Sequence, residues 1–271
     1  MKKIKVLISA PIDDNLYSLL VSKLCLDSDE IEIVGIICLK VFSFSRIFSE
    51  FKRLRKKIFI KIINKYFFRK TKNKTNDTHK KLISEFKLKF NSLKKFSKLN
   101  KIDFFEAVNP NEISAVNFLK NKKPDLILSI GSIILRENFL NTPKIGTLNV
   151  HMGILPRFRG IGVTEWPIIE AMSLDQVNLG ISLHFVEKGV DTGPILFKKN
   201  IHILKNDTLS SIELRFLPEM VNAMLKGVKM IHNGKYDKQM QSNDSGKQYF
   251  FTHHRMREIL DKKLNMFFNE K

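Results

Sequence analysis

The stretch from residue 4 to residue 38, IKVLISAPIDDNLYSLLVSKLCLDSDEIEIVGIIC, indicates an α/β fold. Its two ends, residues 4–9 and 32–38, are short apolar runs of the kind that form buried strands. Between them, leucines recur at helical spacing, at positions 16, 19, 20 and 24. The chain therefore opens with a predicted strand, helix and strand.

The same alternation continues along the chain. Further strands are predicted at residues 102–108, 125–131, 146–151 and 180–186, and helices at about 111–120 and 208–233. Strands that alternate with helices favour a mostly parallel sheet covered on both faces, in which ligands bind beyond the carboxyl ends of the strands. His151 and the turn at Gly131 lie at two such ends.

A basic insertion, residues 42–101, interrupts this alternation. Most of the net charge of +20 comes from residues 46–101, which hold 20 Lys and Arg against three acidic residues. Residues 44–62 have the pattern of a basic amphipathic helix, residues 70–79 that of a polar loop, and residues 80–98 that of a second helix. The insertion suits a solvated hairpin or docking on an anionic membrane surface. Nucleic-acid binding is a weaker alternative, because no zinc finger or recognisable RNA module is present.

Composition excludes several other classes. A hydrophobic content of 43% is ordinary for a globular protein, and no run approaches the roughly 18 uncharged residues of a membrane span. The first apolar run ends at Pro11, which is too early for a signal peptide. We expect a cytoplasmic protein, held at the inner membrane surface if the insertion binds lipid. Cys25 and Cys38 lack metal-ligand spacing, and no metal is expected.

The residues most suggestive of chemistry lie in LNVHMGILPRFRG (148–160) and GVDTGPIL (189–196). Asn149 and His151 alternate in a predicted strand, so both side chains leave the same face. Asp191 follows on a loop flanked by glycine. Acyl or formyl transfer to an amine passes through a tetrahedral oxyanion, and it needs hydrogen-bond donors and a route for a proton. An amide, an imidazole and a carboxylate supply these functions.

These stretches resemble the 10-formyltetrahydrofolate-dependent formyltransferases, which act on glycinamide ribonucleotide, methionyl-tRNA or nucleotide-linked amino sugars. The resemblance rests on Asn149-Val150-His151, Leu155-Pro156, Arg159-Gly160 and Asp191-Thr192-Gly193. It covers residues 1–205, apart from the insertion, and implies a Rossmann-like catalytic core followed by a C-terminal helix and short tail at 206–271. It implies Asn149, His151 and Asp191 as catalytic residues.

The resemblance also implies 10-formyltetrahydrofolate as co-substrate. The residues expected to hold it lie in two loops: Ile130, Gly131, Ile133, Ile134, Leu135 and Val190. The chain departs from the family at Met152-Gly153, where many members have Pro-Ser. This departure concerns the shape of the acceptor pocket.

Features that the sequence lacks narrow the choice of amine acceptor. The loop after the first strand, SAPIDDN, has no glycines to approach a phosphate, which counts against glycinamide ribonucleotide. Only about forty residues follow the last predicted helix, too few for a separate tRNA-binding domain. A nucleotide-linked amino sugar is therefore the leading acceptor. The residues expected to hold it by charge and stacking are Arg157, Arg159, Trp166 and the tail aromatics Tyr249, Phe250 and Phe251.

Three alternatives remain at this point. The same fold hydrolyses formyltetrahydrofolate in some relatives, and methionyl-tRNA or glycinamide ribonucleotide remains possible as the acceptor. A non-enzymatic module binding nucleic acid or an anionic membrane is the third alternative. The aromatic tail also suggests a homodimer contact.

Overall fold

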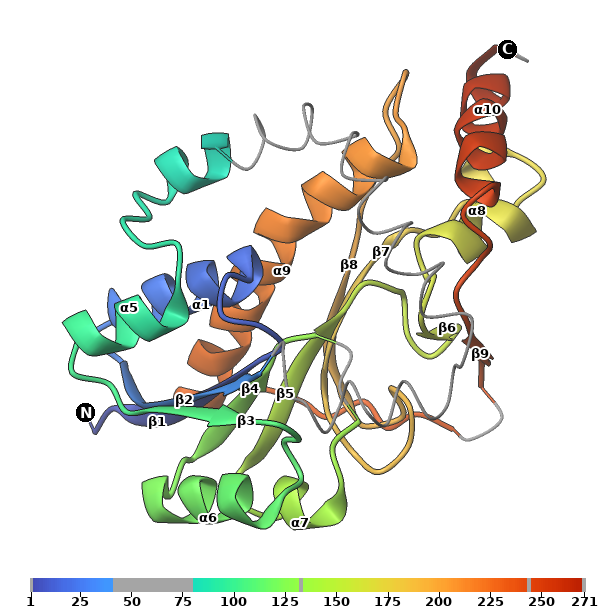
Figure 1. The fold of residues 1–271 in the computed structure, drawn as a ribbon. Helices are drawn as coiled ribbons and strands as arrows, with labels where there is room; N and C mark the ends of the chain where they lie inside the picture. The colour runs from blue at the N-terminus through green and yellow to red at the C-terminus, as the bar shows by residue number, and fades with distance from the viewer. Residues whose placement is uncertain (1, 41–79, 132–133, 243–244, 270–271) are drawn as a thin grey trace, which may run out of the picture.

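The computed structural model describes residues 2–40, 80–131, 134–242 and 245–269 (Figure 1). The strands are β1 (Ile4–Ala10), β2 (Ile31–Leu39), β3 (Phe104–Ala107), β4 (Leu126–Ser129), β5 (Gly146–His151), β6 (Phe158–Gly160), β7 (Gly180–Phe185), β8 (Ile195–Asn200) and β9 (Lys247–Tyr249). The helices are α1 (Leu16–Leu26), α5 (Leu93–Leu99), α6 (Ile113–Lys122), α7 (Glu137–Leu140), α8 (Glu165–Glu170), the 3-10 turn η2 (Leu174–Gln176), α9 (Leu209–His232) and α10 (Met256–Asn269).

The main sheet has seven strands in the order β3-β2-β1-β4-β5-β7-β8. The first five are parallel to their neighbours, whereas β7 is antiparallel to β5, and β8 to β7. The mostly parallel α/β sheet expected from the sequence is confirmed. Strand β8 was not predicted, because its second half, Lys198–Asn200, is exposed at the sheet edge and lacks an apolar alternation.

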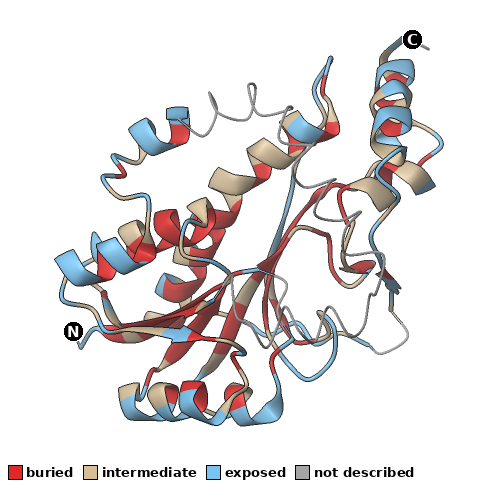
Figure 2. Ribbon diagram, in the orientation of Figure 1, coloured by how far each residue is buried: buried red, intermediate tan, exposed pale blue. Residues whose placement is uncertain are grey.

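Helices cover both faces of this sheet (Figure 1). Successive residues of β1 point to opposite faces, so Val6 and Ile8 join the core beneath α1 and α9 while Leu7 joins a smaller core beneath α6 and α7. Burial is concentrated in the sheet and on the helix faces that contact it (Figure 2). Two apolar layers thus hold the strand ends in place.

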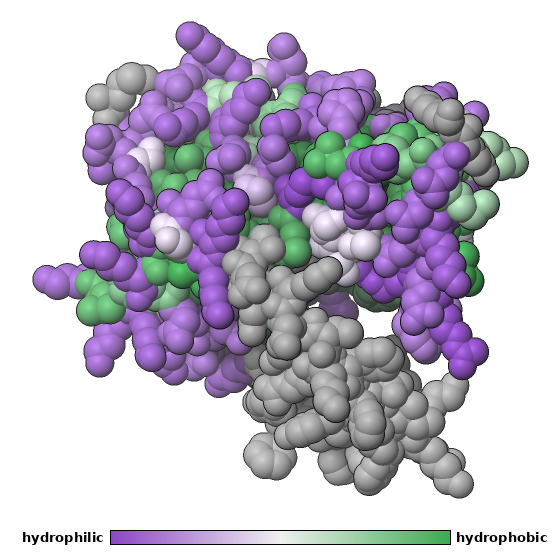
Figure 3. Space-filling view, turned by 90° about the horizontal axis from the view of Figure 1, so that it is seen from above, coloured by the Kyte–Doolittle hydropathy of each residue, from purple (hydrophilic) through white to green (hydrophobic). Residues whose placement is uncertain are grey.

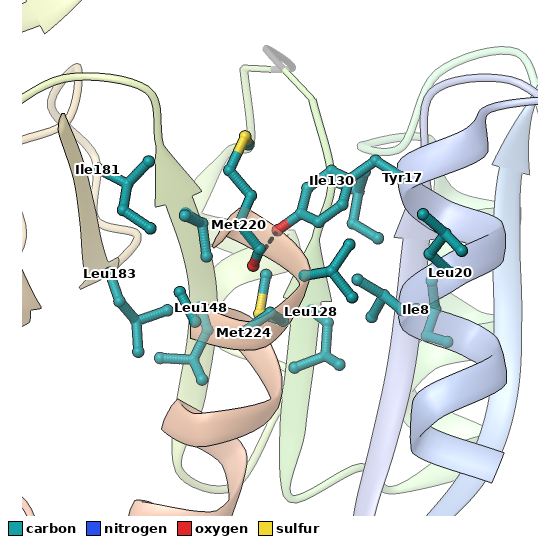
Figure 4. Close-up of a cluster of buried hydrophobic side chains, with 14 of the residues drawn as sticks. Ile8, Tyr17, Leu20, Leu128, Ile130, Leu148, Ile181, Leu183, Met220 and Met224 are labelled. Atoms are coloured by element: carbon teal, nitrogen blue, oxygen red, sulfur yellow. Dashed lines mark hydrogen bonds between the residues drawn. The ribbon is translucent and has the colours of Figure 1, made fainter. Parts of the chain in front are cut away.

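Helix α9 belongs to the larger of these two cores. Met220 and Met224 on α9 pack beside leucines and isoleucines of β1, β4, β5 and β7, and the Tyr17 hydroxyl donates to the Met220 carbonyl at 3.4 Å (Figure 4). A capping box at Thr208 and Ser211 starts the helix, as the sequence indicates. The predicted helix at 208–233 is confirmed.

The second helix predicted in the insertion is only partly right. Residues 80–85 are helical, but the chain then leaves the helix, with Lys87 at φ +48°, before α5 begins. Ser92 caps α5, and its hydroxyl donates to Asp13 in the loop after β1. A new N-cap interrupts what spacing alone predicts as one helix. The predicted amphipathic helix at 44–62 and polar loop at 70–79 lie outside the described residues.

The C-terminal tail contains more structure than the sequence interpretation assigned. Strand β9 pairs in parallel with β6 to make a second, two-stranded sheet, and α10 packs on α8. The helix buries Leu260, Leu264 and Phe267, which recur at helical spacing. This amphipathic pattern was visible in the sequence and was missed among the polar residues.

Within the described ranges, none of the helices is long and apolar enough to cross a membrane. Hydrophilic side chains predominate on the face seen in Figure 3, with small apolar patches between them. Both cysteines are buried thiols, and burial raises the pKa of each to about 12.

Candidate active site

Strand β5 brings two of the predicted site residues to its carboxyl end. Asn149 and His151 are two residues apart and therefore leave the same face of the strand. The parallel partner β4 places Ser129 beside Asn149, and the antiparallel partner β7 places His184 opposite it. The strand predicted at 146–151 has these same bounds.

Both ring nitrogens of His151 face oxygen acceptors. Nε2 lies 2.8 Å from the Phe158 carbonyl oxygen, and Nδ1 lies 3.4 Å from Oδ2 of Asp191. A carbonyl and a carboxylate only accept hydrogen bonds, so the doubly protonated ring satisfies both partners. The ring is 7% exposed. In this arrangement neither N–H of His151 is directed at open space.

Asp191 approaches the same place from the loop between β7 and β8. Its backbone is left-handed, with φ +51°, a conformation uncommon for a residue other than glycine. Its Oδ2 accepts a hydrogen bond from the Gly160 amide at 2.8 Å, and its Oδ1 lies 3.7 Å from Nε2 of His184. The carboxylate thus lies between two histidines and a backbone donor.

His184 is a site residue that sequence analysis missed. Its Nδ1 lies 2.8 Å from the Phe185 carbonyl and its Nε2 lies 3.3 Å from Nδ2 of Asn149. Burial lowers the pKa of His184 to about 4; Asp191 opposes this shift and His151 adds to it. The neutral ring, protonated at Nδ1, accepts from the Asn149 amide. The antiparallel pairing of β5 with β7 places His184 at the site, and local sequence pattern does not specify this register.

Two glycines of the motif permit these contacts. A Cβ added to Gly153 would lie 2.8 Å from both His151 Nε2 and the Phe158 carbonyl oxygen. Gly160 has φ +90°, and a Cβ there would lie 2.3 Å from the Tyr249 carbonyl oxygen. Gly153 therefore leaves room for the hydrogen bond between His151 and Phe158.

The residues expected to hold folate fall into two groups. Ile134 and Val190 expose 80% and 41% of their surface. Ile130 and Leu135 are buried, one in each core, and Gly131 forms an exposed turn with φ +96°. Ile133 lies outside the described residues.

An asparagine that the sequence did not single out supports this loop. The Asn111 side chain donates to the Ile134 carbonyl at 2.9 Å and accepts from the Arg136 amide at 2.6 Å. These two hydrogen bonds connect the residues just before α6 to the loop after β4.

The residues expected to hold the acceptor differ in exposure and in the partners that their side chains bond. Arg157 is 58% exposed, pairs with Glu170 and lines a cleft of about 740 Å³. Arg159 is 6% exposed, and its guanidinium is bonded within the protein. Trp166 donates through its indole N–H to the Phe250 carbonyl and packs beside Tyr249. Of these side chains, Arg157 is open to a ligand.

The three tail aromatics also differ in exposure. Tyr249 is buried and donates to Glu170, whereas Phe250 and Phe251 are 67% and 79% exposed. Among the described residues, no group of three or more His, Cys, Asp or Glu side chains has the geometry of a metal site.

The fold and these strand-end groups define a class of α/β transferases. A model of the formyl transferase family matches residues 51–228, and the chain belongs to this family. It is 32% identical over 165 residues to a bifunctional polymyxin resistance protein ArnA of Wigglesworthia glossinidia brevipalpis, covering 60% of this chain and 24% of that protein. It is 28% identical over 156 residues to a methionyl-tRNA formyltransferase of Fusobacterium nucleatum, covering 57% and 49%.

The chain thus spans half or less of the length of these two relatives. Among solved structures, an N-formyltransferase of Helicobacter canadensis in complex with folinic acid and dTDP-3-aminofucose has the same fold. The TM-score is 0.56 at 17% identity, over 99% of this chain and 82% of that one. The family expected from the sequence is confirmed.

Proposed function

We propose that the protein transfers a formyl group from 10-formyltetrahydrofolate to a primary amine. The observation that carries this proposal is the convergence of Asn149, His151 and Asp191, with His184 behind them, at the carboxyl end of β5. Three segments of chain supply these groups. Membership of the formyl transferase family supports the same reaction.

In the proposed reaction the amine nitrogen attacks the formyl carbon to give a tetrahedral oxyanion. The carbon–nitrogen bond to the folate then breaks, the folate nitrogen gains a proton and the amine nitrogen loses one. Asn149 has two amide N–H groups, of which one donates to His184. The second is free to donate to the oxyanion.

His151 and Asp191 supply charge and a path for the proton. Protonated His151 stabilises the oxyanion electrostatically, and its Nε2–H donates directly only if the hydrogen bond to Phe158 opens. Asp191 contacts the ring at Nδ1 and is the acceptor, directly or through water, for the proton that the amine loses.

For the folate we propose the surface between Ile134 and Val190. Both side chains are exposed and apolar, as an aromatic ring system requires of its binding surface. Ile134 follows β4, and Val190 lies in the loop between β7 and β8, next to Asp191. The buried Ile130 and Leu135 then anchor the loop from beneath, and Gly131 makes its turn.

For the acceptor we propose a nucleotide-linked amino sugar. The same fold accommodates folinic acid and dTDP-3-aminofucose together in the Helicobacter canadensis protein. The loop after β1 carries Asp13 and Asp14, and Asp13 accepts the Ser92 hydroxyl and the Lys94 amide at the start of α5. Two carboxylates there disfavour a phosphate directly on this loop. Arg157, which is exposed and lines a cleft, is the cation that we propose for the phosphate.

Methionyl-tRNA is the second candidate acceptor, because a methionyl-tRNA formyltransferase is among the curated relatives. The deciding experiment offers purified protein 10-formyltetrahydrofolate with nucleotide 3-amino sugars, nucleotide 4-amino sugars or methionyl-tRNA. Tetrahydrofolate release and product mass identify the acceptor. Folate release without any formylated product would indicate a hydrolase instead.

The catalytic roles are tested by single substitutions. Asn149→Ala, His151→Ala and Asp191→Ala are each expected to lower kcat at least about 100-fold, the scale for loss of one group stabilising the transition state. His232→Ala, at the far end of α9, is the matched control and should retain wild-type turnover. Wild-type turnover by His151→Ala would reject the mechanism.

A further inference from the structure

We propose that Gln241 and Arg159 are positioning residues that hold Asp191 against His151. This inference rests on the proposed role of Asp191 in formyl transfer. Arg159 then bonds within the protein and does not bind the acceptor. The C-terminal segment contributes Gln241 to the site.

The side-chain amide of Gln241 makes four hydrogen bonds. Its Nε2 donates to the backbone carbonyls of Asp191, at 2.9 Å, and Gly193, at 2.7 Å. Its Oε1 accepts from Nε and Nη2 of Arg159, at 3.3 Å and 3.0 Å. Carbonyls only accept and a guanidinium only donates, so the partners fix the orientation of the amide. Gln241 therefore links the Asp191 loop to Arg159.

Arg159 is itself held firmly. It is 6% exposed, and its Nη2 also donates to the Ser242 carbonyl at 3.3 Å. The next residue, Gly160, donates its amide to the Asp191 carboxylate. Arg159-Gly160 thus reaches Asp191 twice, at the carboxylate through Gly160 and at the backbone through Gln241. Together these contacts form a closed ring of hydrogen bonds that connects Asp191, Gln241 and Arg159-Gly160.

Asp191 is a residue whose position needs such support. Its left-handed backbone is one that a non-glycine residue rarely adopts without surrounding constraints. Its carboxylate must also lie near Nδ1 of His151 to orient the ring. Because catalytic groups lose efficiency on displacements of about 1 Å, a loop without the Gln241 bonds would weaken the reaction more than substrate binding.

Gln241 lies beyond residues 51–228, the part that matches the family model. The backbone of Gln239 pairs with Ile195 at the start of β8, which brings Gln241 within reach of the loop preceding that strand. The C-terminal segment thus reaches the site through the path that the chain takes after α9.

The Gly160 amide reports the position of the Asp191 carboxylate without reference to activity. We would measure its hydrogen exchange by NMR in protein labelled at glycine nitrogen. Gln241→Ala removes all four bonds. Gln241→Glu keeps an acceptor for Arg159 but removes both donors to the loop. Gln239→Ala is the matched control, because its exposed side chain belongs to the same segment and its pairing with Ile195 is through the backbone.

Both Gln241 variants should exchange the Gly160 amide faster than wild type, while Gln239→Ala matches wild type. Both should lower kcat roughly 10- to 100-fold with the two KM values within about threefold of wild type. If Gln241 only anchored Arg159, Gln241→Glu would behave as wild type in both measurements, and the proposal would be overturned. Should the wild-type protein transfer no formyl group, the proposed function fails, and the exchange of Gly160 still decides whether Gln241 holds Asp191.

Discussion

Nε2 of His184 lies 3.3 Å from Nδ2 of Asn149, and the two residues are paired across β5 and β7. The histidine is 1% exposed and its other nitrogen is occupied by the Phe185 carbonyl. His184 therefore presents a lone pair to Asn149 and fixes the direction in which the second amide hydrogen of Asn149 points.

Replacement of His184 should test this orienting role. His184→Leu fills the buried space but removes the acceptor, so we expect kcat to fall about 10-fold or more through misdirection of Asn149. His184→Gln supplies an amide oxygen as a substitute acceptor and should retain more activity than the leucine variant. Steady-state kinetics on both proteins make the comparison, and equal activity of the two variants would argue against the orienting role.

The same histidine should make stability depend on pH. Burial lowers the pKa of His184 from 6.5 to about 4, so between these values the unfolded chain binds the proton that the folded chain excludes. The free energy of unfolding should therefore decline as the pH falls from about 6.5 toward about 4.

This decline is measured by urea unfolding at a series of pH values in wild type and His184→Gln. The variant lacks the titrating group, so its free energy of unfolding should change less across this interval. Parallel curves for the two proteins would show that His184 does not carry this pH dependence.

Gly153 should control the orientation of the His151 ring. In Gly153→Ala the new Cβ would meet the ring at Nε2 and the Phe158 carbonyl at the same time, so the hydrogen bond between them should lengthen or break. Because the ring also contacts Asp191, we expect altered kcat with a loss of stability of about 1–3 kcal/mol.

The measurements for Gly153→Ala are a crystal structure of the variant and its thermal unfolding. Gly234→Ala is a useful contrast, since nothing lies within 4 Å of its added Cβ and only its backbone, at φ +65°, is strained. An unchanged distance between His151 and Phe158 in Gly153→Ala would contradict the expectation.

Several parts of the fold could be predicted from local pattern. The apolar runs of β1, β2 and β5 and the leucine spacing of α1 identify buried elements, because burial on one or both faces imposes a period on the sequence. Edge strand β8 was not predicted, because half of it faces solvent. Helix α10 was not predicted either, although its apolar spacing is regular.

The candidate site also has a part that the sequence predicted and a part that it did not. The sequence by itself determined the family and singled out Asn149, His151 and Asp191, because a strand alternates its side chains and a motif records residues close together in the chain. Only the tertiary structure decided that His184 faces Asn149, that Arg159 is buried, and that Gln241 bonds Asp191 across 50 positions of sequence. These contacts depend on the register of antiparallel strands and on the path of the chain after α9, and local periodicity specifies neither.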